Sequence, residues 1–514
     1  MSEIAIAGPD ANKANRADKA DTAAWLAVAA GTIGALMATL DVSIVNASLP
    51  TIQGEIGASG TEGTWVSTAY LVAEIVMIPL AGWLERILGL RRFLLGATGL
   101  FVLFSMWCGL SHTLPQMIVG RVGQGFTGGA MIPTALTIVA IRLPPRQQPV
   151  GIALFGMTAV MGPVLGPVVG GWLTENLSWH YAFFLNLPIG VGLMVLILIG
   201  LPPRRMNSSE LRNTDVLGLL GLVLGLGALT VVLEEGQRDR WFESELIRCL
   251  TSVSLLGFVL LLLGQLTARV PIIRLSVLRG RNFCGAFLMN LMMGAALYGI
   301  LYIIPQFLSA VAGYNSEQSG YVAAISGIPT VLMLAAFPVL VRIIDVRVAV
   351  AIGIGLYSAS CFVDAHLNPE FAGPQFILTQ VMRGFAQFFS FLFLNQAATS
   401  SVPPELAADA SGLFNAARNL GGSFGLAVIA ILQDQRTTLH MDRLSEAITT
   451  NSFAARHVVG HTALEQLSNT LMGQATVMAY ADLNWVFGVA LIAMIPLVFA
   501  LEPLPKDVHV SAGH

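Results

Sequence analysis

Fourteen apolar runs, most of them about 20 residues or longer, occupy the chain between residues 24 and 501. A helix needs roughly 20 apolar residues to cross a bilayer. In lipid, every backbone polar group must be paired within the protein, so such segments are expected to be helical. Charged residues make up only 11% of the 514 residues, against about a quarter in soluble proteins. The sequence therefore predicts an all-α polytopic membrane protein.

The predicted spans follow the apolar runs and fix a topology. They are 24–48, 64–84, 92–111, 114–140, 150–173, 179–201, 214–233, 246–267, 283–311, 318–341, 346–365, 374–398, 406–432 and 480–501. With the N-terminus in the cytoplasm, eighteen of the 27 Lys and Arg residues lie in cytoplasmic segments and six in outer ones. Because cytoplasmic loops are enriched in Lys and Arg, both termini are predicted to be cytoplasmic.

Part of the chain repeats at an offset of 259 residues. Gly125-Phe126 falls on Gly384-Phe385, and Pro144-Pro145 falls on Pro403-Pro404. Two parallel halves around a central pathway are typical of transporters. The predicted organisation is a cytoplasmic tail (1–23), a six-helix bundle (24–201), a two-helix insert with its cytoplasmic loops (202–282), a second six-helix bundle with an outer loop at 433–479 (283–501) and a second tail (502–514).

Composition and motifs exclude several other classes of protein. A net charge of −3 gives no basic surface for nucleic acid. The four cysteines lie in or beside apolar runs, so we interpret them as packing residues. No cleaved signal peptide is indicated, and no Walker pattern points to ATP as a power source. We expect no cofactor and no metal site.

Five sequence motifs resemble one family. They are "LDVSIVNASLPTI" (40–52), "GWLERILGLRR" (82–92), "RVGQGFTGGA" (121–130), "GPVLGPVVGG" (162–171) and "WHYAFFLNLPIG" (179–190). In this order they resemble the major facilitator superfamily, and within it the fourteen-span drug:proton antiporters of the EmrB-like group.

The resemblance implies a fold and a function. The fold is that of two six-helix bundles with a two-helix insert, and the function is proton-driven multidrug efflux of hydrophobic weak acids and related toxins from the inner membrane. EmrB-like subunits work with a periplasmic adaptor and an outer-membrane channel. The motif between spans two and three implies a conformational role for Gly82, Glu85, Arg86, Gly89 and Arg91. Glu85 stands where the family usually has Asp.

The fifth predicted span is unusually rich in glycine and proline. Its motif comprises Gly162, Pro163, Gly166, Pro167, Gly170 and Gly171. Glycines four residues apart share one helix face and allow close helix packing, while the prolines kink the helix. We interpret this helix as a pivot and seal between the two halves, and ordinary close packing is the alternative.

Three ionisable residues lie at matching depth in the first half. Asp41, Glu74 and Arg121 are predicted roughly 10–14 Å below the outer surface, at 1.5 Å per helical residue. Buried charges are costly and mark proton pathways. We predict that Asp41 or Glu74 carries the proton and that Arg121 modulates its release. The alternative is that Arg121 is a structural clamp held by Asp41 and backbone carbonyls.

The second half carries two arginines inside spans, Arg383 and Arg418, with no acid expected at comparable depth. Asp364 is placed at the outer end of its span. Such cations need carbonyls, the acids of the first half or an anionic substrate, so amphipathic weak acids or neutral lipophiles are the predicted cargo; packing anchors are the alternative. The remaining residues predicted to line the cavity are Gln387, Asn395, Met292, Tyr298, Tyr302 and Phe385.

The outer segment 433–479 is the longest predicted loop, and by the resemblance it meets the adaptor. Its histidines, including His440, show no metal spacing and are interpreted as solvated. Other functions remain open at this point. A dedicated exporter or symporter of one metabolite is the nearest alternative, followed by a sensor that does not transport. An intramembrane enzyme is disfavoured because no span interior contains histidine.

Overall fold

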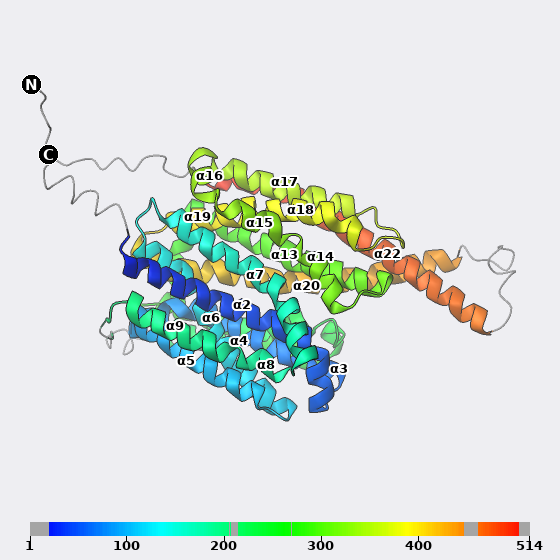
Figure 1. Ribbon diagram of the computed structural model, residues 1–514, viewed down its shortest axis with the longest axis horizontal. Helices are drawn as coiled ribbons and strands as arrows, with labels where there is room; N and C mark the ends of the chain where they lie inside the picture. The colour runs from blue at the N-terminus through cyan, green and yellow to red at the C-terminus, as the bar shows by residue number, and fades with distance from the viewer. Residues whose placement is uncertain (1–19, 205, 207–213, 269, 447–460, 503–514) are drawn as a thin grey trace, which may run out of the picture.

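The computed structural model describes residues 20–204, 206, 214–268, 270–446 and 461–502, and every regular element in these ranges is helical. The predicted tails at 1–19 and 503–514 lie outside them. The helices run roughly along the long axis of the molecule, side by side (Figure 1). The first helix begins at the same end of the bundle at which the last one finishes.

The N-terminal elements form one bundle. They are α2 (Thr22–Ile56), α3 (Gly60–Gly63), α4 (Trp65–Leu88), α5 (Leu90–Gly109), α6 (Leu114–Arg142), α7 (Gln148–Asn176), α8 (His180–Phe184) and α9 (Asn186–Gly200). The Asp21 side chain accepts a hydrogen bond from the Ala24 backbone N–H and begins α2, and Gly57 ends it at a φ of 68°. Helix α2 packs against α6, α7 and α9, and α6 also contacts α4 and α5.

The insert consists of two long helices and two short ones. These are α11 (Val216–Glu235), η1 (Trp241–Glu243), α12 (Glu245–Thr267) and η2 (Leu275–Arg279). Helix α11 packs against α12 on one side and against α4 and α20 on another. The insert is therefore attached to both halves rather than to one.

The C-terminal elements form the second bundle. They are α13 (Arg281–Ala312), α14 (Ser316–Ala324), α15 (Gly327–Leu334), α16 (Phe337–Ile343), α17 (Val346–Asp364), η3 (Gly373–Phe376), α18 (Ile377–Gln387), the π-helical turn η4 (Phe388–Leu392), α19 (Phe393–Ser400), η5 (Pro404–Leu406), α20 (Ala407–Glu446), α22 (His461–Met494) and η6 (Ile495–Ala500). Helix α13 packs against α20, and α17 packs against α18 and α22.

All fourteen predicted spans coincide with helical elements. Within the described ranges, ten helices are long and apolar enough to cross a membrane, and an eleventh span arises if the segments 317–334 and 337–343, bent by 71°, are counted as one. The other three predicted spans correspond to α4, α7 and α20. The chain is therefore an integral membrane protein, and a count of fourteen spans stays a prediction.

The prediction that residues 433–479 form an outer loop is wrong for most of this segment. Helix α20 continues to Glu446 and α22 begins at His461, while 447–460 lie outside the described residues. Polar residues pair the two helices here: His440 Nε2 lies 2.8 Å from Asp482 Oδ2, and Gln433 donates to the Tyr480 hydroxyl at 3.2 Å. His440 is buried, not solvated as predicted. These helices extend beyond the rest of the bundle (Figure 1).

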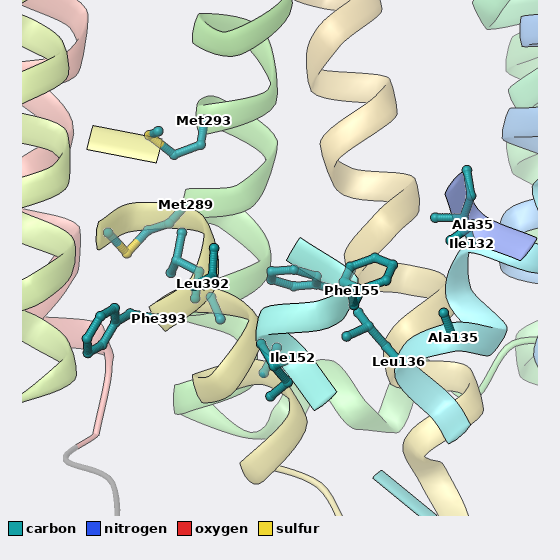
Figure 2. Close-up of a cluster of buried hydrophobic side chains, with 14 of the residues drawn as sticks. Ala35, Ile132, Ala135, Leu136, Ile152, Phe155, Met289, Met293, Leu392 and Phe393 are labelled. Carbon is teal, nitrogen blue, oxygen red and sulfur yellow. The ribbon is translucent and has the colours of Figure 1, made fainter. Parts of the chain in front are cut away.

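A continuous apolar core joins the two bundles. Figure 2 shows Ile152 and Phe155 of α7 between Leu136 of α6 and Leu392 of the π-helical turn, with Met289 of α13 nearby. Apolar contacts of this kind are not directional. In this protein they join buried side chains of the two halves in one cluster.

Candidate functional site

The centre of the N-terminal bundle contains a buried ion pair. Arg121 Nη1 lies 2.5 Å from Asp41 Oδ2, and both side chains are fully buried. The other carboxylate oxygen of Asp41 accepts hydrogen bonds from Gln124 Nε2 at 3.0 Å and from Asn186 Nδ2 at 2.7 Å. Asp41 is thus held by one positive and two neutral donors, so the charge of its carboxylate is balanced inside the protein.

Arg121 is fixed by groups other than Asp41. Its Nε donates to the Val66 carbonyl at 3.1 Å, and its guanidinium carbon lies 4.2 Å from the centre of the Tyr70 ring. Its buried Nη2 has no hydrogen-bond partner within the described chain. A buried donor without a partner costs about 1–3 kcal/mol. This guanidinium therefore has a donor available for a different partner in another conformation.

Glycines of α6 bring the pair next to α4. A Cβ at Gly125 would overlap the Tyr70 carbonyl, and one at Gly129 would lie 2.7 Å from the Glu74 carbonyl oxygen. The "RVGQGFTGGA" segment thus contains both Arg121 and the glycines that let α4 pack closely over it. Gln124 lies in this motif and Asn186 lies in "WHYAFFLNLPIG", so both partners of Asp41 fall in motifs that sequence analysis quoted without assigning them a role.

Glu74 does not join the Asp41–Arg121 pair. It is 5% exposed, and no hydrogen bond or ion pair within the described residues reaches its carboxylate. Arg418 of α20 and then Arg121 are the charges that act on it most strongly. Of the three residues predicted to cluster, the structure therefore pairs two, while the third stands apart from the pair and experiences the charges of an arginine from each half.

The expectation that Arg383 lacks an acidic partner is wrong. Arg383 Nη2 lies 2.5 Å from Asp364 Oδ2, with both side chains 1% exposed, and Arg383 Nε donates to Ser360 Oγ at 3.2 Å. Asp364 is the last residue of α17, whose C-terminal turn packs against α18. The long Arg383 side chain spans the difference in depth. An anionic substrate is not needed to balance Arg383.

Arg418 instead faces a small central cavity. The cavity has a volume of about 30 Å³, and its lining residues come from both halves: Phe155, Gly156, Leu297, Thr330, Gln387, Phe391, Leu392, Asn395 and Arg418. The buried Arg418 Nε and Asn395 Oδ1 have no hydrogen-bond partner among the residues described. The π-helical turn ends at this cavity, and π turns are frequent at functional sites.

Three of the eight residues predicted for the cavity line it, namely Gln387, Asn395 and Arg418. Arg383 and Gln387 also line a smaller void of about 10 Å³. The other four predicted residues do not line the central cavity: Met292, Tyr298, Tyr302 and Phe385. Met292 and Tyr302 are each 39% exposed, so their faces of α13 point away from the core.

The motif between α4 and α5 connects the two halves. Arg86 Nη1 lies 2.5 Å from Asp409 Oδ2 of α20, and a Cβ at Gly82 would lie 3.1 Å from the Asp409 backbone N. Gly89 has a φ of 79°, which turns the chain between α4 and α5. Arg91 donates to a carbonyl at 3.3 Å. The Glu85 carboxylate experiences the charge of Asp409 more strongly than any other charge.

Removing the Arg86–Asp409 pair is expected to loosen the predicted cytoplasmic end. Hydrogen bonds to charged groups contribute about 1.5–3 kcal/mol, and about 1.4 kcal/mol is tenfold in a population. In Asp409→Asn, spin labels at Arg92 and Ser400 should show a separated population roughly tenfold larger than in the parent. Glu405→Gln, an exposed acid close by, is the control. Unchanged distances in Asp409→Asn would contradict this role.

The glycine face of α7 does not lie between the halves. A Cβ at Gly162 would lie 2.7 Å from Thr39 Oγ1, and one at Gly170 would lie 2.8 Å from the Ile44 carbonyl, so this face packs on α2 of the same bundle. The prediction that these glycines form a seal between the two halves is therefore wrong. Pro167 on another face does approach Gly320 of α14. The side chain of Pro163 lies outside the described part, and a Cβ at Gly171 would meet nothing within 4 Å.

Two glutamates at the end of α11 were missed by sequence analysis. Glu234 Oε1 accepts from Ser423 Oγ of α20 at 2.7 Å, and Glu235 Oε1 accepts from Thr68 Oγ1 of α4 at 2.7 Å. The predicted span ended at residue 233, which assigned both acids to a loop. The helix continues to Glu235, which is 2% exposed. These acids link the insert to both halves.

Comparisons with known proteins identify the family. The profile described as Major Facilitator Superfamily matches residues 31–426. The chain belongs to the major facilitator superfamily. The fold also resembles that of a crystal structure described as the human organic anion transporter MFSD10 (TETRAN), with a TM-score of 0.59, 15% identity and coverage of 91% of this chain and 99% of the other. At this identity the likeness shows the fold alone.

Relatives place this major facilitator in the EmrB-like multidrug efflux family. The chain is 34% identical over 425 residues to the colistin resistance protein EmrB of Acinetobacter baumannii, covering 83% of each chain. It is 31% identical over 489 residues to the multidrug export protein EmrB of Escherichia coli K12, covering 92% of this chain and 94% of the relative. The family identified from the motifs is thus confirmed.

Proposed function

We propose that this chain exports lipophilic drugs and toxins across the inner membrane by proton-coupled antiport, with alternating access of a central site. The observation that carries the proposal is the fully buried Asp41–Arg121 pair at the centre of one bundle. Ionisable residues inside membrane spans mark ion and proton pathways. The names of the EmrB relatives support drug efflux as the activity.

In this proposal Asp41 binds and releases the proton. Protonation removes the negative charge that Arg121 Nη1 faces, while Gln124 and Val66 keep the guanidinium in place. The freed donor of Arg121 then needs another acceptor, and Glu74 is a buried acid on which the charge of Arg121 acts. Proton binding at Asp41 thereby weakens the contact between α6 and α2 and frees Arg121 for a contact with α4. Glu74 is a second candidate for the proton carrier.

The closed cavity is consistent with alternating access. Ligand pockets for drug-sized molecules occupy about 300–1,000 Å³, whereas the central cavity measures about 30 Å³. Cargo therefore requires the halves to separate at one end. Contacts that such a motion would break are the Arg86–Asp409 pair at the predicted cytoplasmic end and the Pro167–Gly320 contact toward the other end.

The proton gradient is the proposed energy source, with no cofactor. One proton entering down 100 mV yields about 2.3 kcal/mol, and a tenfold gradient of cargo costs about 1.4 kcal/mol. A single proton per cycle therefore supports more than one decade of accumulation. The proposed cellular setting is the inner membrane with both termini in the cytoplasm.

The proposed cargo is an amphipathic weak acid or a neutral lipophile, because the unpaired Arg418 Nε faces the cavity. Arg418→Met should reduce export of an anionic fluorescent substrate at least tenfold and change export of a neutral one less than twofold. Arg443→Met, an exposed arginine of the same helix, is the control. Equal loss for both substrates, or a strict preference for cationic dyes in the parent, would contradict this cargo class.

The proposed partners follow from the EmrB-like family. A periplasmic adaptor and, through it, an outer-membrane channel would contact the outer ends of α20 and α22, which extend beyond the bundle (Figure 1). The described polar residues on these ends include Arg436, Asp442 and Gln466. Co-purification of the full chain with a co-expressed adaptor tests this assembly.

Transport by the purified chain in liposomes tests the proposed function. An imposed pH gradient should drive uptake of a lipophilic substrate against its concentration gradient, and an uncoupler should abolish that uptake. Substrate movement in the same direction as protons would favour a symporter of one metabolite. Specific binding without any flux would favour a sensor. Unaltered uptake after the gradient collapses would overturn the proposal.

A further inference from the structure

Two adjacent acids, Glu234 and Glu235, end the first long helix of the insert, α11, at its predicted outer side. The carbonyl groups in the last turn of a helix carry a partial negative charge, which disfavours acidic side chains there. Each acid is nevertheless held by a different half. Glu234 accepts from Ser423 of α20 at 2.7 Å. Glu235 accepts from Thr68 of α4 at 2.7 Å. Their position therefore points to a role other than the stability of α11.

The two acids differ in how their charges are balanced. Glu235 is 2% exposed, and Arg238 Nη1 lies 2.7 Å from its Oε2, so the charge of this carboxylate is paired. No ion pair among the described residues involves Glu234, which accepts from the neutral hydroxyl of Ser423 instead. Glu234 is also half-buried, so the protein does not enclose it completely. Of the two acids, Glu234 is therefore the one whose charge no cation holds.

Polar side chains continue inward from Glu234 along one face of α20. They recur every four residues, and residues at this spacing share a helix face. All of them are buried: Ser411, Asn415, Asn419 and Ser423. Burying polar groups is costly, so membrane-spanning helices rarely carry such a face without a use for it. Helices α4, α11 and α13 all pack against α20. The polar face thus leads from the end of the insert into the interior of the protein.

Tyr298 of α13 connects this polar face with a second acid. Its hydroxyl donates to Asn419 Oδ1 at 3.5 Å. The charges of Arg418, Glu74 and Glu234 all act on Tyr298. Tyr298 is therefore close enough to experience both acids, although Glu74 belongs to α4 and Glu234 to α11. A hydroxyl group both donates and accepts hydrogen bonds, which suits it to lie on a path for protons.

The ionisable groups near Glu234 and Tyr298 come from several elements. They are Glu235 and Arg238 at the end of α11 and in the turn after it, Glu74 of α4 and Arg418 of α20. Glu235 and Arg238 pair with each other, and Arg418 is a cation. Glu74 is thus the remaining acid of this group, and no hydrogen bond or ion pair within the described residues reaches its carboxylate.

We propose that Glu234 collects a proton at the outer side and passes it inward to Glu74. This inference rests on the proposed proton-coupled export. A carboxylate oxygen of Glu234 gains the proton from solution and releases it to the carboxylate of Glu74, so Glu234 returns to its charged form and only O–H bonds form and break. A proton that neutralises Glu74 changes the charge that Arg121 experiences. The insert thereby contributes a residue to transport, in addition to bridging the halves.

The pH dependence of gradient-driven uptake in liposomes tests the proposal. Glu234→Gln keeps an oxygen that accepts from Ser423 but cannot bind the proton. With the same pH difference imposed, uptake should fall at least tenfold when the proton-supplying side is at about pH 8, where a collecting residue matters most. It should fall less than twofold at about pH 6, where protons are abundant. Ser423→Ala removes the hydrogen bond and keeps the acid, so it should retain at least half of the parent uptake. Glu245→Gln, an exposed acid of the insert, is the matched control and should behave as the parent.

The outcomes separate a proton-collecting residue from a structural contact. An equal loss at both pH values in Glu234→Gln, accompanied by a similar loss in Ser423→Ala, would overturn the proposal in favour of a structural contact. Parent uptake by Glu234→Gln at both pH values would also overturn it, as would an equal loss of substrate-for-substrate exchange, which moves no proton. If the parent itself ignores the gradient, the proposed antiport fails; if the parent is coupled and Glu234→Gln is coupled equally, only the role of Glu234 fails.

Discussion

Asp41→Asn is expected to abolish proton-driven export while leaving the chain folded. Asparagine is nearly isosteric and still accepts hydrogen bonds from Gln124 and Asn186, but it cannot be protonated or balance Arg121. Removing one partner of a buried ion pair costs about 3–5 kcal/mol. Uptake driven by a pH gradient in liposomes should fall at least a hundredfold, to the background of empty liposomes.

Two further measurements make the Asp41 result interpretable. Asp434→Asn, an exposed acid on α20, should retain parent activity. Exchange of substrate for substrate without a gradient should survive in Asp41→Asn, because this mode moves no proton. Full gradient-driven uptake by Asp41→Asn would remove Asp41 from the proton pathway, and Glu74→Gln would then be the decisive variant.

Gly166→Leu is expected to have the second largest effect, on stability. A Cβ at Gly166 would overlap the Ser43 Cβ and lie 3.0 Å from the Ser43 carbonyl carbon, so a leucine forces α7 away from α2. Overpacking a tight contact costs about 1–3 kcal/mol, and more where backbone lies opposite. The purified variant should melt at least 10 °C lower or fail to accumulate.

Gly171→Leu is the matched control for this variant. Gly171 lies on the same helix, and a Cβ added to it would have no atom within 4 Å. The leucine there is expected to keep or slightly raise stability, because glycine lowers helix stability by about 0.5–1 kcal/mol relative to alanine. Equal destabilisation by both leucines would show that glycine matters for flexibility rather than for contact with α2.

The helices were predictable because each must satisfy a strong local requirement. A span in lipid has to be apolar, long and hydrogen-bonded within itself, so the apolar runs alone located the long helices from α2 to α22. The polar ends of α20 and α22 were not predictable in this way. There, His440 and Gln433 find partners on the opposite helix, a tertiary effect that the pattern of apolar residues does not report.

Ion pairs within the bundles were predictable only in part. Asp41 and Arg121 lie at equal depth in their spans, and the structure pairs them. Asp364 and Arg383 differ in depth along their helices, yet they form an ion pair. This pair was not predicted because a comparison of depth alone ignores the length of an arginine side chain. Glu234 was missed because the boundary of a span was drawn before its last buried turn.

The direction in which the α7 glycines face was beyond sequence analysis. Spacing by four residues shows that Gly162, Gly166 and Gly170 share a face, but it does not identify the neighbouring helix. The structure places α2 there and leaves a different face of α7 toward α14. The four-residue spacing of the glycines therefore predicts a close helix contact, but it does not say which helix makes it.

Proton movement driven by a substrate gradient alone distinguishes coupled antiport from uncoupled transport. Liposomes containing the purified chain, a trapped pH indicator and equal pH on both sides would receive an outward or inward gradient of substrate. With Asp41 as the proton carrier, protons should move opposite to the substrate, the signal should disappear in Asp41→Asn, and its direction should reverse with the gradient. Substrate flux at the parent rate with no change in internal pH would contradict it.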